Sequence, residues 1–475
     1  SRGIGIYHPI EKQCKSFFTL PPQSKNHELS PDNAFLAYTK ENNLYLLNNN
    51  GEETKITQDE NKNIVSGQAV HRNEFGITKG IFWSPDGKKL AFYRMDETTV
   101  TDYPLVDISA RVAQLKTIKY PMAGMTSHEV TIGIFDTTTQ ETVYLKTGSP
   151  KDKYLTNIAW NSDGKSIYVA ELNREQNHMK LIQYDAISGN RIKILFEETH
   201  PKYVEPLSPI LFVPDNSDRF VQQSRKDGYN HLYLYDSSGK RLKQLTSGAW
   251  EVTEVFGFDE KGRHLFFAST QPSPLERHIY SVNLKNSKIS RYTPTPGIHT
   301  ITLSRSGKYF TDQYSAHDNP GKIDLLNTQN KKTINLSSAA NPFADYDMPS
   351  VEQGSLKAAD DKTDLYYRLV KPTDFNPTKK YPAIIYVYGG PHSQLVSNRW
   401  QFGSGGWETY MAQKGYVIFV MDNRGTSYRG IDFENVTYRH LGVEEAKDQM
   451  KGVEFLHSLP YVDKNRLGIY GWSFG

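Results

Sequence analysis

Residues 471–475, Gly-Trp-Ser-Phe-Gly, have the types and the spacing that a serine nucleophile requires. In this G-x-S-x-G pattern the serine lies on a tight, strained turn after a strand, and the flanking glycines let the backbone pass without a Cβ in the way. The residues at 466–472 have the apolar character of a buried strand. The pattern therefore predicts that Ser473 is a nucleophile for acyl transfer, rather than an ordinary turn serine.

Acyl transfer also requires hydrogen-bond donors that stabilise the oxyanion of the tetrahedral intermediate. One donor follows from the pattern itself, because the backbone N–H of Phe474 comes directly after the nucleophile. A second candidate is the hydroxyl of Tyr388, which stands at the end of an apolar strand and before a Gly-Gly-Pro turn. The alternative for Tyr388 is an aromatic side chain that only packs beneath this turn.

The elements that must position these residues are indicated by two apolar runs and one helical pattern. The runs at 381–390 and 415–425 are typical of parallel strands that are buried on both faces. Farther along, apolar residues follow helical spacing at Val443, Ala446, Met450, Val453 and Leu456. Alternating strands and helices predict an α/β domain over residues 346–475. This domain is expected to be incomplete at Gly475, with later strands beyond it.

Residues 1–345 repeat a short phrase in which a polar turn leads into a strand of alternating apolar residues. The phrase begins at Ser30, Ser84, Asn161, Val213, Asp259 and Ser304. The last four starts are 45 to 52 residues apart, close to the length of a four-stranded propeller blade. We therefore expect residues 1–345 to form a β-propeller, with earlier blades before residue 1. The long interval after Ser84 predicts an insertion or a blade whose turn has diverged.

Composition argues against several classes of function. The formal net charge is +3, from 56 basic and 53 acidic residues, so the charge pattern does not favour nucleic acid or a membrane surface as a partner. No apolar run reaches the length of a membrane span. The single cysteine, Cys14, excludes an internal disulfide and a CxxC site, and no HExxH motif occurs. We therefore expect neither a metal nor a cofactor.

Several segments of the chain match motifs of a known family. They are YPAIIYVYGGP at 381–391, DNRGTSYRG at 422–430, LGVEEAKDQMKGVEFL at 441–456 and GWSFG at 471–475. Together they resemble the prolyl oligopeptidase superfamily of serine peptidases, in its dipeptidyl peptidase IV branch. Residues 70–97 and 120–136 are similar, within that branch, to the bacterial prolyl tripeptidyl aminopeptidases. The resemblance implies a β-propeller that caps an α/β-hydrolase domain, with cleavage after proline near the free N-terminus of peptides.

The resemblance also implies roles for individual residues. It assigns Ser473 as the nucleophile, Tyr388 as the oxyanion-hole tyrosine and Phe474 as the aromatic wall of the proline pocket. Other matched positions are interpreted as structural, with Trp472 as a packed aromatic residue and a polar turn bracing the sheet edge. That turn contains Asp422, Arg424 and Gly425.

The free α-amine of such a substrate is mostly protonated at neutral pH and needs a carboxylate partner. In the dipeptidyl peptidase IV branch two adjacent propeller glutamates bind it. The matching segment here is HRNEFG, with Glu74 alone and Asn73 where a second acid would stand. Without the resemblance Glu74 would be interpreted as a solvated surface residue. The departure favours release of X-X-Pro tripeptides over X-Pro dipeptides.

The catalytic triad of α/β-hydrolases runs in the order Ser, Asp or Glu, His. The acid and the base are therefore expected beyond Gly475, and none of the 14 histidines is assigned as the base. Expected partners are proline-containing peptides, a homodimer is possible, and the resemblance implies a periplasmic or secreted protein. Two alternatives stay open: an acylaminoacyl peptidase or esterase on the same fold, whose substrates have no free amine, and a non-catalytic propeller that binds peptides or partners.

Overall fold

The computed structural model describes residues 3–214 and 216–475, so Asp215, within the repeat that begins at Val213, lies outside the described residues. The chain folds into two compact units. The first unit comprises Ser1–Phe212, Ser217–Gln222 and Tyr235–Lys240, and the second comprises Val213–Asn216, Gln223–Leu234 and Arg241–Gly475. The second unit thus contains the repeats that begin at Asp259 and Ser304, together with the candidate nucleophile Ser473.

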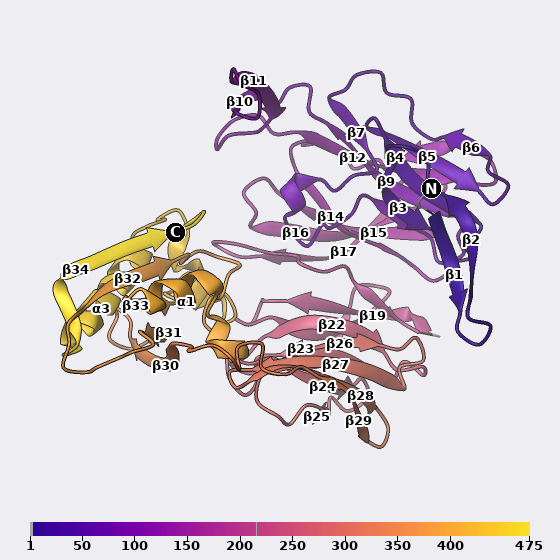
Figure 1. The fold of residues 1–475 in the computed structure, drawn as a ribbon. Coiled ribbons are helices and arrows are strands. Elements are labelled where there is room, and N and C mark those ends of the chain that lie inside the picture. The colour runs from indigo at the N-terminus through magenta and orange to yellow at the C-terminus, as the bar shows by residue number, and fades with distance from the viewer. Residues whose placement is uncertain (1–2, 215) are drawn as a thin grey trace. The chain divides into compact units, whose positions relative to one another are not determined.

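Within the described residues, six antiparallel sheets of four or five strands follow one another along the chain (Figure 1). The first three contain β3 (Lys25–Leu29), β4 (Phe35–Lys40), β5 (Asn43–Asn48) and β6 (Glu53–Lys55); β7 (Ile64–Ser66), β8 (Ile81–Trp83), β9 (Lys89–Asp96), β12 (Glu129–Asp136) and β13 (Thr142–Tyr144); and β14 (Tyr154–Trp160), β15 (Ser166–Leu172), β16 (His178–Asp185) and β17 (Arg191–Thr199). The last three contain β18 (Leu211–Val213), β19 (Asn216–Ser224), β20 (His231–Asp236) and β21 (Arg241–Gln244); β22 (Val252–Phe258), β23 (His264–Ser269), β24 (His278–Asn283) and β25 (Ile289–Arg291); and β26 (Ile298–Leu303), β27 (Tyr309–Ala316), β28 (Asn319–Asn327) and β29 (Thr333–Ser338). Ahead of them β1 (Gly3–His8) pairs with β2 (Gln13–Thr19). The expected β-propeller fold is confirmed.

The repeated phrase forms the turn between two consecutive strands of a blade. In the first repeat the hydroxyl of Ser30 donates to Asp32 over 2.6 Å and accepts from the N–H of Phe35 over 2.9 Å, which closes the turn between β3 and β4. The long interval after Ser84 holds an insertion, as one of the two alternatives predicted. It is a separate hairpin of β10 (Asp102–Asp107) and β11 (Gln114–Lys119) between β9 and β12.

The last sheet contains the predicted strands of an α/β domain. Its order is β30-β31-β33-β32-β34, formed by β30 (Ser350–Lys357), β31 (Asp364–Lys371), β32 (Tyr381–Val387), β33 (Val417–Met421) and β34 (Val462–Gly471). β32 is parallel to both β33 and β34, which confirms the three parallel strands. β31 is antiparallel to β33 and to β30, two strands that the sequence pattern did not indicate. The expected domain boundary between residues 345 and 346 stays a prediction.

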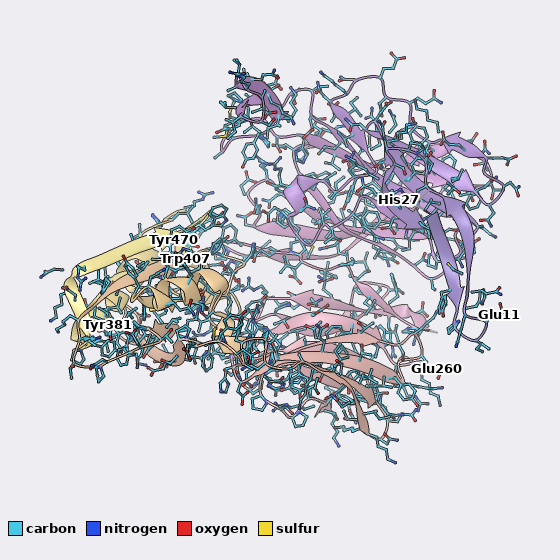
Figure 2. The ribbon with its side chains drawn as sticks, viewed as in Figure 1. Glu11, His27, Glu260, Tyr381, Trp407 and Tyr470 are labelled. Atoms are coloured by element: carbon cyan, nitrogen blue, oxygen red, sulfur yellow. The ribbon has the colours of Figure 1, made fainter. Side chains whose placement is uncertain are left out.

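The central strands of this sheet are buried on both faces, as their continuous apolar runs predict. On one face Ile385 and Phe419 share a core with Leu456 of α3 (Glu444–Ser458). On the other face Ile384 shares a core with Ala412 of α1 (Gly406–Gln413). The ring of Trp407 in α1 also stacks on Tyr470 of β34 with the ring centroids 4.9 Å apart (Figure 2). Helices on both faces hold the parallel strands in place.

The helix predicted from the spacing of apolar residues is confirmed as α3, and Val453 and Leu456 of the expected face pack in the core, but the rest of that face is exposed. Val443, Ala446 and Met450 are exposed. The helix instead buries Asp448 and Gln449, because their side chains hydrogen-bond to the turn after β33. A polar contact at the sheet edge therefore sets the orientation of this helix.

The remaining helical segments are short. They are η1 (His71–Asn73), η2 (Trp400–Gly403), α2 (Ile431–Glu434) and η3 (Asn435–Thr437). None of the helices among the described residues is long and apolar enough to cross a membrane.

Candidate active site

Ser473 lies on a turn that begins where β34 ends. Its φ is 57°, in the left-handed region that residues with a Cβ rarely adopt. The N–H of Gly475 donates to the carbonyl of Trp472 over 3.0 Å and closes the turn, and the Ser473 side chain is exposed. Such strain costs of order 1–3 kcal/mol and is concentrated at functional sites. This backbone has the strained conformation that the nucleophile pattern predicts.

Glycines at this turn are explained by close backbone approaches. A Cβ on Gly475 would lie 1.9 Å from the carbonyl oxygen of Val387, and one on Gly471 would lie 2.2 Å from the carbonyl carbon of Gly475. A Cβ on Gly390 would lie 2.7 Å from ring carbons of Phe474. Larger residues at these positions would push the turn away from β32 and its following loop.

Tyr388 lies beside the nucleophile turn because of the strand register. β32 and β34 are parallel neighbours in which Val387 pairs with Gly471, so the residues that follow both strands meet at one edge of the sheet. The ring centroids of Tyr388 and Phe474 are 6.1 Å apart, with the planes tilted by 39°. The structure thus brings Ser473, Phe474 and Tyr388 to one place.

A fully buried asparagine braces the turn that follows Tyr388. The amide of Asn423 donates to the carbonyl of Gly389 over 2.8 Å and accepts from Gln449 of α3 over 2.9 Å. Gly389 has a φ of 70°, and a Cβ there would lie 2.7 Å from the Asn423 side-chain oxygen. The sequence analysis did not identify Asn423, although a polar residue directly after a buried strand was a signal that could have indicated it.

Asp422 holds the loop that runs from Tyr388 toward η2. Its buried carboxylate accepts the N–H groups of Leu395 over 2.9 Å and Val396 over 2.8 Å. Burial raises the pKa of Asp422 to about 6, although hydrogen bonds from the same two N–H groups oppose the shift. Asp422 therefore braces the sheet edge, as predicted.

Arg424 and its neighbours complete this brace. The Arg424 guanidinium donates to Asp448 over 2.9 and 3.0 Å and to Glu444 over 2.8 Å, which ties the turn to α3. Gly425 has a φ of 105°. The structural interpretation of Arg424 and Gly425 is confirmed. Among the described residues Trp472 is 67% exposed at the end of β34, and its interpretation as a packed residue stays a prediction.

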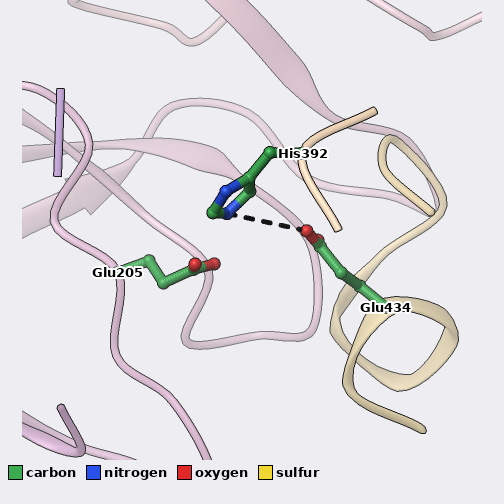
Figure 3. A group of neighbouring side chains, drawn as sticks. All are labelled: Glu205, His392 and Glu434. Carbon is green, nitrogen blue, oxygen red and sulfur yellow. Dashed lines mark ion pairs between the residues drawn. The ribbon is translucent and has the colours of Figure 1, made fainter. Parts of the chain in front are cut away.

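The loop after Tyr388 is also tied to α2 through a charged network. Figure 3 shows His392 facing Glu434, with 3.9 Å between the imidazole Nε2 and the nearer carboxylate oxygen. Glu434 also pairs with Arg225 over 2.5 Å, and Arg225 pairs with Glu251 over 3.2 Å. Burial raises the pKa of Glu251, which the Arg225 charge opposes. These contacts fix one side of the loop.

Within residues 3–214 and 216–475, no side chain hydrogen-bonds to Ser473. None of the described histidines is therefore placed to take the hydroxyl proton, which is consistent with the expected order of the triad. The described residues provide a strained serine, the backbone N–H of Phe474 and the nearby hydroxyl of Tyr388. This set can attack a carbonyl and stabilise an oxyanion once a base is supplied.

Glu74, in the first unit, lies at the end of a strained turn. The φ values of His71, Arg72, Asn73 and Phe75 are between 53° and 65°. Glu74 itself has an exposed side chain, and its carboxylate forms no hydrogen bond or ion pair with a described residue. Asn73 donates to the carbonyl of Ile77 over 3.2 Å, so the residue that replaces a second acid supports the turn.

Two buried histidines, His71 and His128, support the turn that carries Glu74. His71 Nε2 accepts the N–H of Leu155 over 3.2 Å, so its Nδ1 carries the proton and donates to His128 Nε2 over 3.0 Å. Phe75 packs edge-on against Tyr154 with ring centroids 4.9 Å apart. Burial lowers the pKa of His71 well below 6.5 and that of His128 to about 4, so both imidazoles are neutral at physiological pH.

The antiparallel sheets and the serine turn at the end of a parallel strand define a β-propeller combined with an α/β-hydrolase domain. Comparison with protein families gives two matches. The family described as dipeptidyl peptidase IV (DPP IV) N-terminal region matches residues 7–321, and the prolyl oligopeptidase family matches residues 400–475. The chain belongs to the prolyl oligopeptidase superfamily, in its dipeptidyl peptidase IV-like branch.

Individual relatives agree with this assignment. A probable dipeptidyl-aminopeptidase B of Arthroderma gypseum is 29% identical over 99% of this chain and 55% of its own length. A provisionally named dipeptidyl aminopeptidase IV of Bacteroides ovatus has a crystal structure with a TM-score of 0.93 and 49% identity, over 99% of this chain and 68% of that one. Dipeptidyl peptidase 4 of Porphyromonas gingivalis has a TM-score of 0.89 and 29% identity, over 99% and 67%. The chain thus spans about half the length of such curated relatives as the Arthroderma protein.

Proposed function

We propose that a protein containing this chain is a serine aminopeptidase that cleaves after proline and releases X-X-Pro tripeptides, or X-Pro dipeptides, from the free N-terminus of peptides. The observation that carries the proposal is the left-handed Ser473, on a turn that packs beside Tyr388. In this proposal the Ser473 hydroxyl attacks the carbonyl carbon of the proline residue, and the peptide bond to the next residue breaks to leave an acyl-enzyme ester. The serine proton passes through a base outside the described residues to the amine that leaves, and water then hydrolyses the ester and releases the N-terminal product. The N–H of Phe474 and the hydroxyl of Tyr388 bind the oxyanion.

The same proposal assigns substrate recognition to two further residues. The ring of Phe474 walls the pocket for the proline side chain, and Glu74 binds the α-ammonium of the substrate. Its exposed carboxylate, which has no described partner, is suited to this contact. With only one glutamate in the turn and Asn73 bound to Ile77, the tripeptide product is favoured over the dipeptide.

The test uses a protein that contains this chain and extends beyond Gly475. Gly-Pro, Ala-Ala-Pro and acetyl-Ala-Ala-Pro amides are compared as substrates. The proposal expects Ala-Ala-Pro to be cleaved best and acetylation to reduce kcat/KM strongly. Preference for Gly-Pro would overturn tripeptide release. Equal cleavage of the acetylated substrate would instead favour an acylaminoacyl peptidase. No hydrolysis of any of the three substrates would favour the non-catalytic propeller that binds peptides or partners.

The inserted hairpin supports the homodimer that the sequence analysis left open. Among the described residues β10 and β11 pair only with each other, and an isolated two-stranded hairpin is only marginally stable in water. Val106, Ile108 and Leu115 are 67%, 83% and 71% exposed on it. Light scattering should show a dimer that Val106→Glu weakens, while Ile187→Glu, at another exposed apolar site, should not. A monomeric wild type would contradict this assembly.

The periplasmic or secreted location implied by the resemblance is also part of the proposal. Cell fractionation and immunodetection of the native protein test it, and recovery from the cytoplasmic fraction would contradict it.

A further inference from the structure

A polar cavity in the second unit is lined by two arginine side chains that have no acidic partner among the described residues. Its volume is about 260 Å³. The lining comes from β22, β23 and the start of β26, from the residue that precedes β24, from the loop that follows Tyr388 and from Tyr428. Arg277 and Arg399 supply its positive charge, and Glu254 is the carboxylate in the lining.

Arg277 is held in place by neutral groups. It donates to the carbonyls of Pro274 over 2.9 Å and Glu276 over 2.8 Å, and to the side-chain oxygen of Gln394 over 2.7 Å. Its guanidinium carbon lies 4.0 Å from the ring centroid of Tyr428. Burial lowers the pKa of Arg277. Arg277 also hydrogen-bonds to the Tyr428 side chain. Among the described residues no carboxylate lies within ion-pair distance of Arg277, and the negative charge of Glu251 acts on it only from farther away.

Arg399 is less constrained. Its Nε donates to the hydroxyl of Ser397 over 2.9 Å, and its terminal nitrogens hydrogen-bond to none of the described residues. The neighbouring charge of Arg399 also contributes to the lowered pKa of Arg277, so the two cations repel each other across the cavity. Glu254 forms no ion pair with a described residue, and burial raises its pKa.

The unbonded terminal nitrogens of Arg399 match the chemistry of a carboxylate, which accepts paired N–H donors from arginine. Arg277, whose donors are bound to neighbouring oxygens, adds a fixed positive charge beside them. A bound anion would offset the repulsion between the two cations, neither of which forms an ion pair with a described residue. The volume is below the usual range for a drug-sized ligand, so it suits a single acidic group better than a long peptide. Gln394 and Arg399 belong to the loop that begins at Tyr388, which connects the cavity to the proposed catalytic site.

We propose that the cavity lined by Arg277 and Arg399 binds a carboxylate of a peptide substrate or product. This inference rests on the proposed peptidase function for the identity of the ligand, but not for the binding itself. The carboxylate comes either from an acidic side chain or from the C-terminus of the peptide, and both offer the same two oxygen atoms.

The test measures binding directly, without catalysis. The 475-residue chain is titrated by calorimetry with acetyl-Gly-Asp-amide, acetyl-Gly-Gly with a free C-terminus, and neutral acetyl-Gly-Asn-amide; acetylation removes the amine that Glu74 would bind. At least one of the two acids should bind about tenfold or more tightly than the neutral peptide, and which one binds identifies the source of the carboxylate. Binding should weaken with added salt. Inorganic phosphate serves as the competing anion.

Two substitutions connect the binding to this cavity. Arg399→Gln should weaken binding of the acidic peptide about tenfold or more, since it removes an exposed charge whose loss the fold should tolerate. Arg305→Gln is the matched control, because Arg305 is likewise exposed but lies outside the lining. Arg277→Lys keeps the charge but loses the paired donors, and it is compared after its melting temperature has been checked.

Equal binding of acidic and neutral peptides, no effect of Arg399→Gln, or binding of phosphate alone would each overturn the proposal. These outcomes are independent of peptidase activity. If the carboxylate-binding proposal fails, the assignment of Ser473 and Tyr388 still stands. If Ser473 proves to be inactive, the measured binding of the acidic peptide still stands.

Discussion

The ring of Tyr388 lies near Phe474 of the serine turn, so a catalytic role of its hydroxyl and a packing role of its ring can be separated by removing one oxygen atom. In the longer protein, Tyr388→Phe should lower kcat by a factor of about 100 or more, because a lost oxyanion donor costs about 2.7–4 kcal/mol. KM and the melting temperature should change little. Tyr386→Phe, in the preceding strand, is the matched control. A fall in kcat of less than about threefold would leave Tyr388 as a packing residue.

Glu74 allows an equally specific test of amine recognition. Glu74→Gln should lower kcat/KM for free-amine substrates about tenfold to hundredfold, because a hydrogen bond to a charged group contributes about 1.5–3 kcal/mol. Acetylated substrates should be almost unaffected, since they carry no charge for Glu74 to bind. Glu129→Gln removes another exposed glutamate of the same unit and should leave both substrates unchanged. Equal losses for both substrates would show that Glu74 does not bind the amine.

At the scale of single residues, the sequence predicted those features that depend on contacts within a short segment of the chain. The Ser473 pattern and its glycines depend on contacts within one turn and one neighbouring strand, so their spacing carries the information. Asn423, Asp448 and Gln449 were missed because their contacts join segments far apart in the chain. A polar residue in a helix looks solvent-exposed until the turn that it binds is known.

Among the elements, the turn that carries Glu74 depends on neutral histidines. In the unfolded chain His71 and His128 titrate near 6.5, whereas burial lowers both values in the folded chain. Below pH 6.5 the unfolded state therefore binds more protons than the folded state, and the free energy of unfolding should fall as the pH decreases from 6.5 toward 4. The protection factors of residues 70–77, which correct for the intrinsic slowing of amide exchange in acid, should decrease over the same range.

Substitutions at His128 and at a control histidine distinguish the effect of the His71–His128 pair from the effects of other titrating groups. His128→Phe leaves the Nδ1 proton of His71 without an acceptor, which should cost about 1–3 kcal/mol and accelerate exchange of the turn at neutral pH. His440→Gln changes an exposed histidine in the second unit and should leave that exchange unaltered. Protection factors of residues 70–77 that stay constant between pH 6.5 and 4 would contradict the role of the pair.

Element types were predictable where periodicity is strong. The blade repeats and the parallel strands follow from turn residues and continuous apolar runs, and the structure contains both. β30 and β31 were not indicated, because their residues alternate less clearly and their place is set by pairing with β33. For α3 the helix and the C-terminal part of its buried face, Val453 and Leu456, were predictable, whereas the N-terminal part was not, since Asp448 and Gln449 are buried there instead of the apolar residues.

At the scale of the whole molecule, family and fold were predictable because motifs occur along nearly the entire chain. Activity is different, since it needs groups that the described residues do not bring together. The curated relatives are nearly twice as long as the part that this chain matches. The proposed mechanism therefore divides its requirements between this chain, which carries the nucleophile, and a base outside the described residues.

This division predicts the reactivity of Ser473 in the isolated chain. Because no described side chain can take its hydroxyl proton, a fluorophosphonate probe should label the 475-residue chain slowly, by a factor of about 1,000 or more relative to a longer protein that contains it. Rates of labelling are measured by mass spectrometry at equal probe concentration. Ser473→Ala in the longer protein should abolish the rapid phase, while Ser404→Ala, at a serine in the same unit but outside the turn, should preserve it. Rapid and stoichiometric labelling of the isolated chain at Ser473 would mean that its own residues activate the serine, and the division proposed here would be wrong.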